Sequence, residues 1–164
     1  MAFLVRKIIR NLWVSGDVVP WSPMNIKADT ITKDLRTSSN NLSLWRIESL
    51  EDMPQAVIAL TANFDHLQGI DMVAIDEMDL RSRGLSIGQS PSGTPVVDLR
   101  DTHRNVTDLT LEKLSAFALC VFSAVDAGQV RSYSAKQVKG MLNEAISVGR
   151  INTNALKPSL LLRP

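Results

Sequence analysis

Residues 42–75 constrain the fold more than any other part of the chain. Leu42 to Ile47 is a short, mostly apolar run typical of a strand, and a pattern of helical spacing follows to about residue 66. Ile70 to Ile75 is again short and largely apolar, which is typical of a buried strand. Because this succession has the spacing of a compact βαβ unit, we expect a central sheet.

Local signals fix where the helix of this unit begins. Ser49 is followed three residues later by Asp52, a carboxylate variant of the capping box. Pro54 falls in the first turns, where its missing N–H costs little. The pattern therefore predicts a helix over 50–66 that buries one face.

The flanking segments carry weaker signals. Residues 3–14 fit a helical stripe and a strand equally well, whereas 25–36 favours a short helix. Residues 77–95 hold many glycines and prolines, which predicts an irregular and flexible segment with room for short extended pieces. Residues 96–99 favour a brief strand, and the polar run 100–105 favours a surface loop.

Two helices are expected near the C-terminus. The first, about 109–125, is apolar over so much of its circumference that we expect it to be central. Its inward residues are predicted to be Leu111, Leu114, Ala118, Val121, Phe122 and Val125. The second begins at Ser134, with Gln137 as the capping-box partner. Residues 151–164 form a tail without periodicity.

These elements predict an α+β or α/β fold: a sheet of three to five strands that contains a βαβ unit, covered by three or four helices. A chain of 164 residues suits a single domain over 1–164, and no internal repeat or linker divides it. Cys120 is the one cysteine and lies in an apolar run, so we expect it to be an inert core residue.

Charge and hydropathy exclude several classes of function. The net charge is +1, from 18 basic and 17 acidic residues, so no overall field attracts nucleic acid or an anionic membrane. No apolar run approaches the ~20 residues that span a bilayer, and Arg6, Lys7 and Arg10 interrupt the N-terminal apolar run. We therefore expect a cytoplasmic protein without membrane contact.

One polar cluster is a candidate catalytic site. If 96–99 is a strand, Asp98 and Asp101 lie at its carboxyl end, where open sheets place ligands, and Asp76 lies at the carboxyl end of the preceding strand. Carboxylates from two strand ends can share Mg²⁺. Arg100 and His103 would then assist a metal-dependent phosphoesterase or nuclease. The competing interpretation is a set of solvated residues at strand and helix ends.

Other motifs point to no reaction. Two histidines and one cysteine cannot supply a usual zinc ligand set, and the chain lacks a nucleophile elbow and a phosphate loop. Basic clusters at 6–10, 81–83 and 131–139 leave open a third hypothesis, a nucleic-acid-binding accessory protein.

The preferred hypothesis is a non-catalytic protein-binding module, such as a bacterial assembly subunit or an antitoxin- or immunity-like partner, without a cofactor. Trp21 lies between two prolines in a predicted loop, and tryptophan is enriched at interface anchors. Leu160, Leu161 and Leu162 lie outside any predicted element. These four side chains are the predicted contacts with another protein, with folding back onto the chain's own core as the alternative.

Overall fold

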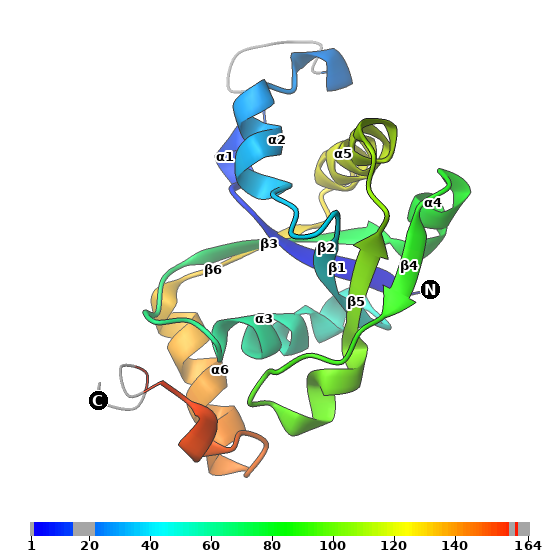
Figure 1. The fold of residues 1–164 in the computed structure, drawn as a ribbon. Helices are drawn as coiled ribbons and strands as arrows, with labels where there is room; N and C mark the ends of the chain where they lie inside the picture. The colour runs from blue at the N-terminus through cyan, green and yellow to red at the C-terminus, as the bar shows by residue number, and fades with distance from the viewer. Residues whose placement is uncertain (1, 15–21, 158–159, 161–164) are drawn as a thin grey trace.

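The computed structural model describes residues 2–14, 22–157 and 160. Within them, six strands form one sheet in the order β4-β5-β2-β1-β3-β6, and every neighbouring pair is antiparallel (Figure 1). The strands are β1 (Phe3–Ile8), β2 (Leu42–Ile47), β3 (Ile70–Asp76), β4 (Ser86–Gln89), β5 (His103–Thr107) and β6 (Val130–Tyr133).

Helices cover both faces of this sheet. The α-helices are α1 (Arg10–Trp13), α2 (Ala28–Asp34), α3 (Met53–Thr61), α4 (Glu77–Ser82), α5 (Leu111–Asp126) and α6 (Ala135–Ser147). Short 3-10 helices are η1 (Pro23–Asn25), η2 (Leu50–Asp52), η3 (Val97–Thr102) and η4 (Thr153–Ala155). Figure 1 shows α3 and α6 on one face of the sheet and α2 and α5 on the other. None of the described helices is long and apolar enough to cross a membrane.

The predicted number of strands is wrong, because the sheet has six strands rather than three to five. The βαβ succession is present as β2, α3 and β3, but these two strands are not neighbours. Both pair antiparallel with β1, which lies between them, so they run in the same direction on its two sides. This is a split βαβ unit. Since no neighbouring strands in the described sheet are parallel, the fold is α+β and the α/β alternative is excluded.

The strands that sequence patterns missed bury few side chains. β5 takes up the second half of the segment 100–105 that was predicted to be a polar loop, and Val106 is its only fully buried residue. Pairing with β2 and β4, rather than an apolar pattern, stabilises it. The strand predicted over 96–99 is also wrong, because Val96 makes only an isolated bridge with Ile151 and η3 follows it.

Predictions based on capping chemistry are confirmed. Ser49 and Asp52 form a reciprocal capping box before α3, in which Ser49 donates its N–H and its hydroxyl to Asp52 Oδ2. Ser134 and Gln137 form the second box at the start of α6. The ambiguous segment 3–14 contains both expected elements, β1 followed by the single turn of α1.

Two hydrophobic cores fill the space between sheet and helices. Val5, Trp45 and Met72 face α3 and α6 on one side. Leu4, Leu44 and Val73, their neighbours along the same strands, face α5 on the other side. Strand alternation therefore divides the apolar residues between two faces, as a sheet covered on both sides requires.

A buried carboxylate fastens α2 to the rest of the fold. Asp34, the last residue of α2, is 7% exposed, and its Oδ2 accepts hydrogen bonds from Trp13 Nε1 at 2.6 Å and Ile9 N at 2.8 Å. The Arg6 guanidinium donates to the Asp34 main-chain oxygen through Nε and Nη2. Thr30, one turn earlier, donates its hydroxyl to Leu12 O at 3.1 Å. Polar bonds therefore attach α2 to β1 and α1.

Replacement of Asp34 tests this attachment. Asp34→Ala leaves Trp13 Nε1 and Ile9 N without their acceptor, so we expect the free energy of unfolding to fall by at least about 2 kcal/mol. Asp29→Ala, at an exposed position of the same helix, is the matched control and should cost less than about 1 kcal/mol. Equal losses for the two variants in urea unfolding would show that the carboxylate does not hold α2.

Burial of Cys120 predicts a pH dependence of stability. The thiol is fully buried in α5, and burial, followed by the nearby Asp79 carboxylate, raises its pKa from 9.0 to about 12. A raised folded-state pKa contributes stability below pH 9.0, and this stability is lost as the pH rises towards about 12. The free energy of unfolding should therefore fall more steeply across this range in the native protein than in Cys120→Ala. Parallel pH profiles would contradict the burial of this thiol.

Candidate functional site

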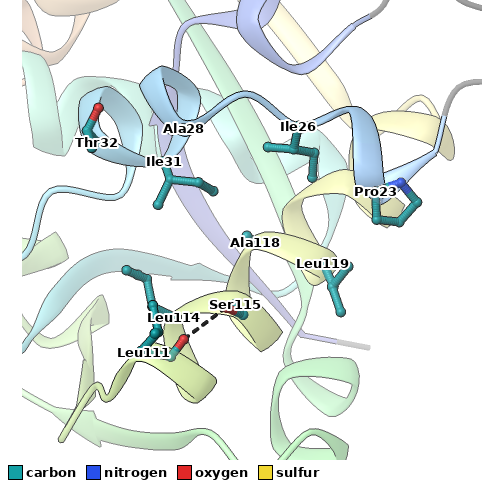
Figure 2. A pocket seen from close by; sticks show the side chains of 10 residues that line it. All are labelled: Pro23, Ile26, Ala28, Ile31, Thr32, Leu111, Leu114, Ser115, Ala118 and Leu119. Atoms are coloured by element: carbon teal, nitrogen blue, oxygen red, sulfur yellow. Dashed lines mark hydrogen bonds between the residues drawn. The ribbon is translucent and has the colours of Figure 1, made fainter.

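An apolar groove opens between the segment 23–32 and α5. It has a volume of about 420 Å³ (Figure 2). We call it the α2–α5 groove. Its lining residues are Pro23, Ile26, Ala28, Ile31, Thr32, Leu111, Leu114, Ser115, Ala118 and Leu119.

Helix periodicity explains why α2 presents an apolar side to this groove. Thr30 and Asp34 are one turn apart, and both are buried by their bonds to α1 and β1. Ile31 lies on a different side of the helix, and Figure 2 shows its side chain directed towards α5. The polar attachment of one side of α2 therefore leaves another, apolar side that packs only partly on the core and borders the groove.

α5 supplies the opposite wall because it is apolar on more than one side. Phe117 and Val121 lie on the side of α5 that faces the sheet, and both are fully buried in the core. Leu114 and Leu119 are only half-buried and line the groove. Leu111 was predicted to face inward, but it lies at the first position of the helix and is 82% exposed, so that prediction is wrong.

The polar groups of the groove are already engaged. Ser115 donates its hydroxyl to Leu111 O at 2.9 Å, and Thr32 donates to Asp29 O at 3.2 Å. None of the described residues that line the groove has a titratable side chain. This described lining can therefore bury apolar groups, but it contains no acid, base or activated nucleophile.

The three carboxylates predicted to bind metal do not share a common partner or role. Asp76 caps α4 by accepting a hydrogen bond from Met78 N at 2.8 Å. Asp98 forms an ion pair with Arg150 at 2.6 Å. Asp101 is exposed on η3. Within the described parts of the chain, no group of three or more histidine, cysteine, aspartate or glutamate residues could hold a metal ion.

The two residues predicted to assist catalysis make contacts that support local structure. Arg100 donates from Nε to Thr94 O at 3.0 Å. His103 Nδ1 donates to Ser90 O at 2.6 Å, and its ring packs edge-on against Trp45 with centroids 5.0 Å apart. These bonds order the segment around η3 rather than aim the two side chains at a common point.

The residues predicted to bind protein have different outcomes. Trp21, Leu161 and Leu162 lie outside the described residues. Leu160 is partly buried and packs against the core between α3 and α6. The chain before it also docks on the domain, because Leu156 is buried in the same core and Lys157 pairs with Asp65 at 2.6 Å.

Sequence reasoning missed the α2–α5 groove, although one signal pointed to it. The helix over 109–125 has apolar residues on most of its circumference, a pattern that predicts a central helix. The same pattern also fits a helix with a second apolar side that is left open. The position of α2 beside it depends on the buried Asp34, which no local pattern indicates.

Comparisons of this chain with protein-family models, with curated proteins and with solved structures found no match.

Proposed function

We propose that the protein is a non-catalytic interaction module that binds an apolar helical segment of a partner protein in the α2–α5 groove. The observation that carries the proposal is the lining: eight of ten residues are apolar, and both hydroxyls are bonded within their own helices. A bacterial assembly subunit and an antitoxin- or immunity-like partner are the classes that fit such a module. We keep the cytoplasm as the proposed compartment on the grounds of the sequence.

The shape of the groove favours a helix as the occupant. Its walls are two helical segments joined by an apolar floor that is continuous with the core, since Ile26, Ile31 and Leu114 all pack against buried core residues. An amphipathic helix presents apolar side chains three and four residues apart, which is how helices fill such grooves. Leu111 at the edge of the groove is the most exposed leucine of its lining and would be covered by this occupant.

A small polar substrate suits the groove less well. The volume falls within the usual range for ligand pockets, roughly 300–1,000 Å³. Such pockets orient a small molecule with a few convergent polar groups, however, and here the two hydroxyls already donate to main-chain oxygens. Apolar side chains need no such orientation, because the hydrophobic effect has no direction.

No observation favours the metal-dependent enzyme over this proposal. That hypothesis needs Asp76, Asp98 and Asp101 to converge, and Asp98 instead pairs with Arg150 while Asp76 caps a helix. Trp21 remains a sequence-based part of the proposal, because it lies two residues before Pro23, which lines the groove.

Leu111→Asp tests the groove directly. An aspartate in the first turn of a helix is favoured by the helix dipole, so α5 should remain folded. Loss of a buried leucine costs about 1.5–3 kcal/mol, so the dissociation constant for a co-purified stoichiometric partner should rise about ten- to hundredfold by calorimetry.

Met78→Asp is the matched control for this variant. Met78 is also an exposed apolar residue in the first turn of a helix, α4, but it does not line the groove. The Met78→Asp variant should bind the partner as tightly as the native protein does. The proposal fails if both variants bind normally, or if both lose binding while thermal unfolding shows that they remain folded.

A further inference from the structure

A second cavity opens where β1 and β2 separate. β1 pairs with β3 along all six residues from Phe3 to Ile8, but it pairs with β2 only from Phe3 to Val5. Beyond this point the Arg6 guanidinium donates from Nη1 to Ser43 O at 2.8 Å, a main-chain oxygen of β2. A cavity of about 350 Å³ lies at this separation.

Positive charge dominates the lining of this cavity. Three cationic residues and one acidic residue line it, namely Arg6, Lys7, Lys33 and Asp34. Asp34 Oδ2 already accepts from Ile9 N and Trp13 Nε1. The Asp34 carboxylate is therefore held by its bonds to Ile9 and Trp13, and it balances only part of the positive charge of the three cations.

The charge of Arg6 is only partly compensated. Its bonds run to neutral main-chain oxygens of Asp34 and Ser43. Burial lowers the pKa of the guanidinium to about 10, against the weaker opposing effect of the Asp34 carboxylate. The fold thus keeps a largely buried cation in the lining of this cavity. Burial of this charge costs free energy, and a bound anion would reduce that cost.

The two lysines are placed to reach an anion. Lys7 Nζ lies 5.2 Å from the centroid of the Phe64 ring, and among the described residues no carboxylate lies within 4.0 Å of it. Lys33 Nζ is 4.0 Å from Asp29, with side chains 56% and 77% exposed, so solvent screens this pair. Both ammonium groups can therefore turn towards a stronger anionic partner.

The remaining walls are apolar. Trp45, Leu60, Phe64 and Ile9 line the cavity beside the cations, and Ile9 is 45% exposed. From these contacts we infer that the cavity is a binding site for a small organic anion, with a carboxylate or phosphate monoester held by Lys7 and Lys33 above Arg6, and an apolar body against Ile9, Leu60 and Phe64. This site is separate from the α2–α5 groove and does not rest on its function.

Three probes of one shape test the inference by titration followed with amide NMR. Naphthoate and naphthyl phosphate carry the anion on an apolar body, and naphthamide is their neutral counterpart. We expect both anions to bind at least about tenfold more tightly than naphthamide, with shifts at Lys7, Ile9, Lys33 and Phe64. Tighter binding of one anion identifies the headgroup that the site prefers.

Substitutions separate this site from the groove. Lys7→Gln combined with Lys33→Gln should weaken both anions about tenfold or more, whereas Lys136→Gln, an exposed lysine of α6, and Leu111→Asp should not. The inference is overturned if naphthamide binds as tightly as the anions, if the double variant binds unchanged, or if the shifts lie at Leu111 and Leu114 instead.

Discussion

The bonds between Arg6 and Asp34 are the constraint on which both candidate sites depend. Asp34 ends α2, and its carboxylate and main-chain oxygen together accept from α1 and from the central strand β1. A buried polar group with every bond satisfied is costly to displace, because each group left unpaired loses its solvation without compensation. This network therefore sets the position of α2 far more strictly than a few apolar contacts would.

Two surfaces follow from that position. On one side α2 stands away from α5, so that an open apolar groove separates Ile31 from Leu114. On the other side Arg6 occupies the point where β1 leaves β2, and its charge remains beside Lys7 and Lys33. The groove and the cavity are thus lined by different residues of the same short helix, Ala28, Ile31 and Thr32 for the groove and Lys33 and Asp34 for the cavity. The two proposals can therefore be tested independently.

Local chemistry made part of this structure predictable. The capping boxes at Ser49 and Ser134 place α3 and α6 because their partners are three residues away in the sequence. β5 and β6 could not be found in this way, since they are short, bury few side chains and depend on distant strands. The position of α2 beside the groove likewise depends on a bond between Trp13 and Asp34, 21 residues apart.

A photo-cross-linking amino acid in place of Leu111 would test the central claim most directly, in cells that produce the protein natively. The account predicts cross-links to one stoichiometric partner, on a peptide whose apolar residues are spaced three and four apart. The same cross-linker at Val148, an exposed residue just after α6, should not reach that peptide. Cross-links only within the chain, or equal yields at the two positions, would contradict the groove as a partner-binding surface.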